Sequence, residues 1–112
     1  MRSIVVTANT GQATSNLVRL DEWGHPQVNI QCVLSGTGNY TVQQSMDDPN
    51  DPFNPVPVGS MTWFPSADAA VVGATASAIS SFSFAPRFVR VIWNSGTGTV
   101  TMTVTQYNVV SL

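Results

Sequence analysis

Charged residues are scarce in this chain. Only 9% of its 112 residues are Asp, Glu, Lys or Arg, lysine is absent, and the formal net charge is −2. Average soluble domains carry roughly a quarter charged residues. A nucleic-acid-binding protein needs a basic face that displaces phosphate counterions, so we expect no nucleic-acid partner. Because 43% of the residues are hydrophobic, the chain is expected to fold rather than to be disordered.

Cysteine pairs and long apolar runs are missing as well, and we expect no leader segment. Cys32 is the single cysteine, so the chain has no internal disulfide and no Cys-based zinc site of its own, which fits folding in a reducing cytoplasm. No run approaches the ~20 apolar residues of a membrane helix, and we expect no membrane partner. The apolar stretch after Arg2 is too short for a signal peptide.

What the sequence does contain is alternation of polar and apolar residues with a period of two, which is typical of strands. A Ser-Gly-Thr-Gly turn at 35–38 and an identical one at 95–98 each separate two alternating segments, which predicts two β-hairpins. The repeat has two explanations, convergent use of glycine where a turn needs a positive φ and internal duplication, and we favour the first. The predicted strands cover residues 4–8, 17–20, 28–34, 40–46, 60–64, 74–84, 86–93 and 99–105.

Seven to eight strands predict one all-β domain over 1–112, an antiparallel β-sandwich or jelly roll, with a small closed barrel as the rival. The polar residues after the first strand predict a flexible N-terminal arm over 1–16. The segment 47–59 holds four prolines and three aspartates, so it cannot continue a central strand. It predicts a stiff surface loop of a length that often contacts a partner.

Residues able to carry catalysis are few. His25 is the only histidine, and no positioned acid–base partner accompanies it, so we interpret it as a loop residue. Cys32 falls in an alternating apolar row, which favours a buried core residue over a nucleophile. We therefore assign no catalytic residue and expect neither an enzyme activity nor a cofactor.

The aspartates of the proline-rich loop are the best candidates for metal ligands. Asp47, Asp48 and Asp51, with the Asn50 amide, offer the oxygen atoms that calcium prefers. Their spacing departs from the calcium-loop pattern, and no glutamate follows at the closing position. We favour capping of backbone amides in turns and assign no metal site, with calcium as the alternative.

Aromatic and arginine side chains supply the candidate contacts. Trp23 and Phe53 fall in predicted loops, where aromatic residues often anchor protein interfaces. With Trp63 they also suggest a sugar-stacking platform, although core packing is the favoured interpretation of the tryptophans, Trp93 among them.

Arg87 and Arg90 flank Phe88 in a predicted strand. Arg90 lies on the same face as Phe88, and a buried arginine needs a partner. We predict an ion pair from Arg90 to the 47–51 loop, or to Asp21 or Glu22, within one chain or across a subunit boundary. The predicted partner interface comprises Trp23, Asp47, Asp48, Asp51, Phe53, Arg87 and Arg90.

Several stretches resemble small virion proteins of tailed bacteriophages: Tyr40-Thr41-Val42-Gln43-Gln44-Ser45-Met46-Asp47-Asp48-Pro49-Asn50-Asp51-Pro52, Thr62-Trp63-Phe64, Phe84-Ala85-Pro86-Arg87-Phe88-Val89-Arg90-Val91 and the second Ser-Gly-Thr-Gly. The resemblance covers most of 28–106, and its motifs are structural without a catalytic signature. It implies a β-sandwich located in the virion and made in the host cytoplasm, serving as a homo-oligomeric capsid decoration or cement protein. Its partners would be the major capsid protein or other virion proteins. A head–tail connector, tail or fibre component is one alternative, and the aromatic residues leave a glycan-binding module as another.

Overall fold

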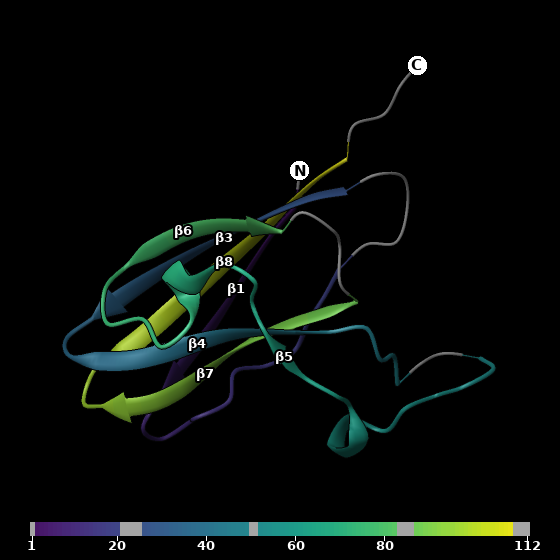
Figure 1. The fold of residues 1–112 in the computed structure, drawn as a ribbon, viewed down its shortest axis with the longest axis horizontal. Helices are drawn as coiled ribbons and strands as arrows, with labels where there is room; N and C mark the ends of the chain where they lie inside the picture. The colour runs from purple at the N-terminus through teal and green to yellow at the C-terminus, as the bar shows by residue number, and fades with distance from the viewer. Residues whose placement is uncertain (1, 21–25, 50–51, 83–86, 109–112) are drawn as a thin grey trace.

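Eight strands in two four-stranded sheets make up most of the chain (Figure 1). This computed structural model describes residues 2–20, 26–49, 52–82 and 87–108. The first sheet has the order β1 (Arg2–Asn9), β8 (Thr99–Asn108), β3 (Pro26–Ser35), β6 (Ala78–Phe82). The second sheet has the order β2 (Val18–Arg19), β7 (Phe88–Gly96), β4 (Gly38–Ser45), β5 (Phe64–Pro65).

The strands pair in a nested order along the chain, so that the first strand pairs with the last and the two middle strands pair with each other. β1 pairs with β8, β2 with β7, β3 with β6 and β4 with β5, always antiparallel. Two further antiparallel pairs, β3 with β8 and β4 with β7, join these four strand pairs into the two sheets. An eight-stranded double sheet with this order is a jelly roll. The prediction of an all-β sandwich or jelly roll is confirmed, and the sheets do not close into one barrel.

The two predicted hairpins are wrong as strand pairings. β3 and β4 are consecutive, yet they lie in different sheets, and the same holds for β7 and β8. Each strand pairs instead with a strand of the other predicted hairpin, β3 with β8 and β4 with β7. A short glycine-containing connection allows a hairpin but does not require one, because here the long ladders between distant segments fix the pairing.

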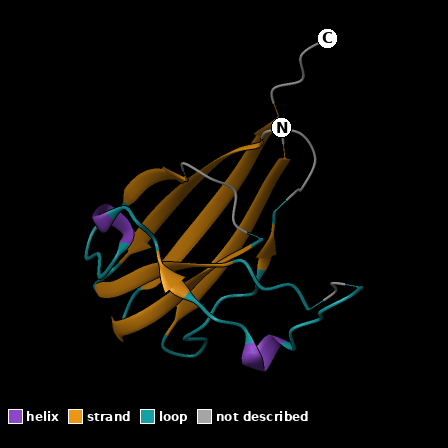
Figure 2. Cartoon of the chain, turned by 45° about the vertical axis from the view of Figure 1, so that its right-hand side comes forward, coloured by secondary structure: helices purple, strands orange, loops and turns teal. Residues whose placement is uncertain are grey.

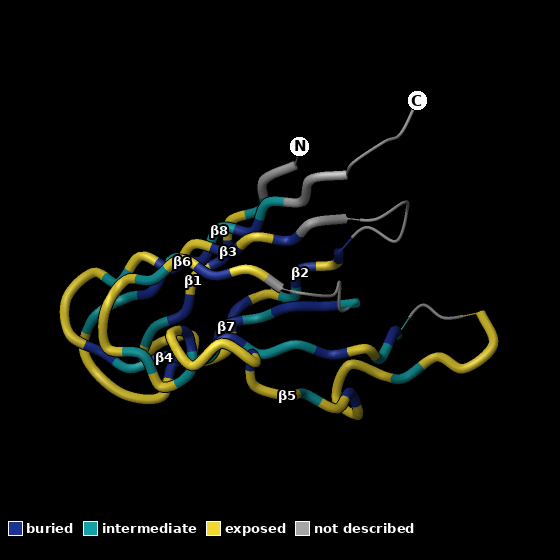
Figure 3. Tube along the Cα trace, turned by 45° about the horizontal axis from the view of Figure 1, so that its top comes forward, coloured by how far each residue is buried: buried dark blue, intermediate teal, exposed yellow. Residues whose placement is uncertain are grey.

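The core lies between the sheets and follows the predicted alternation. On β3, Val28, Ile30 and Cys32 are buried, while Asn29 and Gln31 are exposed. Figure 3 shows buried and exposed positions along the strands. The buried apolar cluster draws on both sheets and on the loops that cross between them. Its members are Val6, Ala8, Val18, Leu20, Val28, Ile30, Cys32, Tyr40, Val42, Val71, Val89, Val91, Trp93, Val100, Met102 and Val104.

The N-terminal segment belongs to the sandwich rather than to the flexible arm that the sequence suggested. β1 pairs with β8 along its whole length, from Arg2 to Asn9. After a turn, the backbone of Ala13 accepts a hydrogen bond from Trp93 N at 2.7 Å, and Ser15 N donates to Val91 O at 2.9 Å. The described part of the predicted arm is therefore fixed to both sheets.

Two predicted strands are shorter than expected. The segment 60–64 contributes only Phe64 to β5, because a 3₁₀ turn, η1 (Val58–Ser60), precedes it. In 74–84 the strand β6 starts only at Ala78, and Ala74 forms an isolated antiparallel bridge with Tyr40. A second 3₁₀ turn, η2 (Ala69–Val71), precedes this segment, and Asp68 caps it by accepting a hydrogen bond from Ala70 N at 3.0 Å. Residues 83 and 84 lie outside the described residues.

The two Ser-Gly-Thr-Gly turns lie against each other at one end of the sandwich. Gly38 pairs with Gly96, and the N–H groups of Thr97 and Gly98 both donate to Thr37 O, at 3.0 and 2.8 Å. A Cβ on Gly98 would lie 2.1 Å from the backbone oxygen of Ser35. Positive φ accounts for Gly36 and Gly96 only, so close approach of two backbones is the second reason for glycine in the repeat.

Replacing Gly98 by alanine should therefore destabilise the fold. The new Cβ meets backbone atoms of the other turn, which cannot move aside cheaply, and we expect a loss of about 1–3 kcal/mol in the free energy of unfolding. Gly59→Ala is the matched control, since a Cβ there meets nothing within 4 Å. Urea unfolding of both variants measures the difference, and equal stabilities would contradict the close approach.

Candidate partner interface

The segment 46–63, which joins β4 to β5, projects beyond the two sheets (Figures 1 and 2). We call it the β4–β5 loop. Its four prolines deny it a place in a ladder, because proline lacks the N–H that a central strand must donate. The predicted stiff loop over 47–59 lies within it, apart from residues 50 and 51, which are outside the described residues.

Aspartates hold the base of the β4–β5 loop. Asp47 Oδ2 accepts a hydrogen bond of 2.6 Å from Thr62 N, which joins the two ends of the loop. Val56 N donates to Asp48 O at 3.1 Å. The Asp48 carboxylate is 6% exposed and forms an ion pair with Arg87 at 3.3 Å. These contacts fix where the loop leaves the sheet.

The carboxylates of Asp47 and Asp48 are thus engaged with protein groups. The sequence predicts that they cap amides in the same turn, whereas the hydrogen bond that Asp47 accepts comes from Thr62 N, across the loop. In the described ranges no group of three His, Cys, Asp or Glu residues converges as a metal site would require. Asn50 and Asp51, named with them in the calcium alternative, lie outside those ranges.

Among the described residues, Arg90 contacts Gln43 and Trp63. Its Nε donates to Gln43 Oε1 at 2.8 Å, and its guanidinium carbon lies 4.1 Å from the centroid of the Trp63 ring. The ion pair to the 47–51 loop is made by Arg87 instead. Partial burial lowers the pKa of Arg90, and stacking on an aromatic face stabilises such a partly dehydrated cation. Asp21 and Glu22, the other predicted partners, lie outside the described residues.

Exposed apolar side chains gather along the β4–β5 loop. Within it, Phe53 is 90% exposed, Met46 58% and Val58 57%, and Phe64, the first residue after the loop, is 61% exposed. The remaining large exposed apolar residues of the described chain, Val5, Val33 and Ile79, belong to the first sheet. Of the four, only Phe53 belongs to the predicted partner interface, because alternation placed Met46 and Phe64 in predicted strands. In the structure β4 ends before Met46, and Phe64 lies in β5 with an exposed side chain.

The tryptophans do not build a common sugar platform in the described chain. Trp93 is a core residue as predicted, and its Nε1 donates to Gly96 O at 3.2 Å. One face of Trp63 is covered by the Arg90 guanidinium. Trp23 and His25, which the sequence placed in a loop, lie outside the described residues. Phe53 is therefore the aromatic residue of this set with the largest accessible surface that the structure describes.

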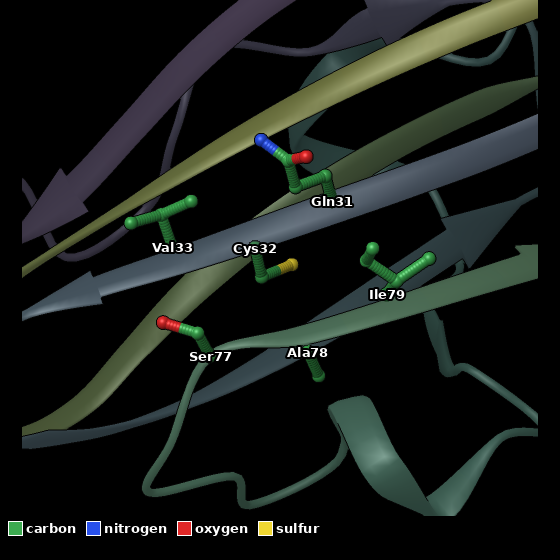
Figure 4. Close-up of a pocket in the computed structure, with 6 residues that line it drawn as sticks. All are labelled: Gln31, Cys32, Val33, Ser77, Ala78 and Ile79. Carbon is green, nitrogen blue, oxygen red and sulfur yellow. The ribbon is translucent and has the colours of Figure 1, made fainter.

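A shallow hollow of about 450 Å³ lies on the first sheet and is lined by Gln31, Cys32, Val33, Ser77, Ala78 and Ile79. Figure 4 shows Cys32 on the opposite side of β3 from Gln31 and Val33. Cys32 is fully buried, which confirms the core role predicted for it, and burial raises the pKa of its thiol to about 11. The lining carries no charged side chain, so the hollow has few groups that could orient a specific ligand.

Comparison with protein-family models, with curated proteins and with solved structures gave no match. Among the described residues, no helix is both long enough and apolar enough to cross a membrane.

Cys32 should react with thiol reagents only when the protein unfolds or the pH is very high. At pH 8 a thiol with a pKa near 11 has about a hundredfold less thiolate than one with the ordinary value near 9. Because the folded pKa is the higher one, the protonated thiol favours the folded state below pH 9, and that contribution is lost as the pH rises through 11. Labelling rates in buffer and in urea measure this, and equal rates would contradict it.

The stack of Arg90 on Trp63 should stabilise the attachment of the segment just before β5 to the second sheet. Arg90→Met keeps the apolar stem but removes the guanidinium, and we expect a loss of about 1 kcal/mol in the free energy of unfolding. The same substitution in a Trp63→Leu background should cost less, because the ring is already gone. A double-mutant cycle from urea unfolding measures the coupling, and additive losses would show that the two side chains do not interact.

Proposed function

We propose that this chain is a structural virion protein of a tailed bacteriophage, a capsid decoration or cement protein that attaches to the shell through its β4–β5 loop. The observation that carries the proposal is that Phe53 is 90% exposed on a loop whose base is fixed by hydrogen bonds and an ion pair. The resemblance of 40–52 and its companion stretches to phage virion proteins supplies the class of partner.

The physical basis is burial of apolar surface on a prepared loop. Full burial of a phenylalanine side chain contributes about 1.5–3 kcal/mol, and Phe53 keeps nearly all of that surface exposed in the free chain. Because Asp47 and Asp48 already order the ends of the loop, less conformational entropy is lost on docking. Few charges need to be dehydrated in such a contact, since the chain has so few.

On a shell, several weak contacts act together and raise the effective affinity. Each copy that binds between neighbouring capsomers touches more than one of them, and linked contacts raise the effective affinity without new chemistry. The added binding free energy then resists separation of the capsomers. A connector, tail or fibre protein would use the same kind of contact but would occur in far fewer copies.

Phe53→Asp should abolish most of the binding to the shell while leaving the fold intact. An aromatic anchor at an interface typically contributes about 2 kcal/mol or more, so we expect at least a roughly thirtyfold loss of affinity. The measurement is co-sedimentation of the purified chain with shells from a phage that lacks it.

Ile79→Asp is the matched control. Ile79 is 76% exposed and lies on β6, away from the loop, and the substitution makes the same change in charge. Loss of binding for Phe53→Asp alone supports the proposal. Wild-type binding by both variants would remove the loop as the contact, and failure of the unsubstituted chain to bind shells would remove the capsid role.

A further inference from the structure

The first sheet ends in a long strand that is paired on one side. β1 forms eight consecutive residue pairs with β8, without a register shift. β8 is its only neighbour in the sheet order of the described residues. The opposite edge of the same sheet, β6, has only five residues. Strand β1 is therefore the longest edge that the described sheets present.

The backbone groups on the free side of β1 can be assigned. Asn9 and Gln12 exchange two backbone hydrogen bonds, Asn9 N to Gln12 O at 2.9 Å and Gln12 N to Asn9 O at 3.1 Å. The N–H and C=O of Asn9 therefore point away from β8. In a strand these groups alternate sides from one residue to the next, so the N–H and C=O groups of Thr7, Val5 and Ser3 point away from β8 too.

The free edge lacks the features that usually protect one. Natural edge strands carry charges, prolines or bulges that prevent pairing with another chain. Between Ser3 and Asn9 there is no charged residue and no proline, and the uniform register excludes a bulge. The side chain of Val5, at the middle of the edge, is 59% exposed.

We propose that a second copy of this chain pairs with that edge, β1 against β1, antiparallel across a two-fold axis at Val5. In this register Val5 lies opposite Val5 of the second copy, and Ser3 lies opposite Thr7. Every outward N–H over 3–7 then meets an outward C=O, because the same three residues face out on both strands. On the inner side, the half-buried Ile4 comes next to Val6 of the second copy, which buries more apolar surface.

The self-complementary register is the reason for choosing a second copy over a strand of another protein. A two-fold contact closes on itself and needs no further partner. No like charges come opposite each other, since Arg2 falls opposite Ala8. The two first sheets become one continuous sheet, while the β4–β5 loops, which leave the second sheets, are not used. This inference does not depend on the virion proposal.

Substitution of Val5 by charged residues tests the register. In Val5→Lys the two ammonium groups face each other across the axis, and like charges at an interface are strongly unfavourable. We expect the dissociation constant of the dimer to rise about tenfold or more for Val5→Lys alone and for Val5→Glu alone. An equimolar mixture of the two should dimerise again, because opposite charges then meet. Sedimentation velocity over a concentration series measures all three samples.

Val33→Lys is the matched control, because Val33 is also partly exposed on the first sheet but lies on the central strand β3. It should dimerise like the unsubstituted chain. Val5→Pro removes one outward N–H without touching the β8 ladder, and it should weaken the dimer in case the charged variants fold poorly. A monomeric unsubstituted chain, a dimer unaffected by Val5→Lys and Val5→Pro, or a mixture that stays monomeric would each overturn the proposal.

Discussion

The contact between the two Ser-Gly-Thr-Gly turns is the constraint on which the rest of the fold depends. Each turn carries the chain from one sheet to the other, from β3 to β4 and from β7 to β8. Gly38 lies against Gly96 and beneath the Trp93 ring, where a Cβ would come within 1.9 Å of the indole. Because the backbones meet so closely, the ladders β3–β8 and β4–β7 start from one point. The β4–β7 register then shifts by one residue between Asn39 and Tyr40.

The amino-acid sequence is informative wherever local pattern decides the outcome. Alternation alone predicts that Val28, Ile30 and Cys32 face the core, as they do, and it puts the strands near their observed positions. It fails on pairing, because a turn of Gly36 and Thr37 indicates a hairpin whether or not its strands stay in one sheet. Which strand lies beside β3 is decided by residues some seventy positions away, and no local pattern carries that information.

In the candidate interface, too, the sequence predicts local features but not the contacts between distant residues. Proline content predicts the β4–β5 loop, and aromatic character points to Phe53. The roles of Arg87 and Arg90 are not separable from sequence, since both flank Phe88. Only the folded chain shows that Arg87 reaches Asp48, whereas Arg90 lies on Trp63 beside Gln43. Their difference in partner follows from their positions, since Arg87 lies just before β7 and Arg90 lies within it, on the strand that β4 separates from β5.

A rigid, weakly charged sandwich with an anchored apolar loop is suited to work by contact. The loop leaves the second sheet, and the unprotected edge belongs to the first, so the proposed attachment and the proposed self-pairing do not compete for the same residues. An electron cryomicroscopy reconstruction of the phage particle tests this role most directly. The proposed role predicts eight-stranded density on the outside of the shell in many copies, with residues 52–58 turned toward the capsomers. Particles whose shell carries no such density would contradict it.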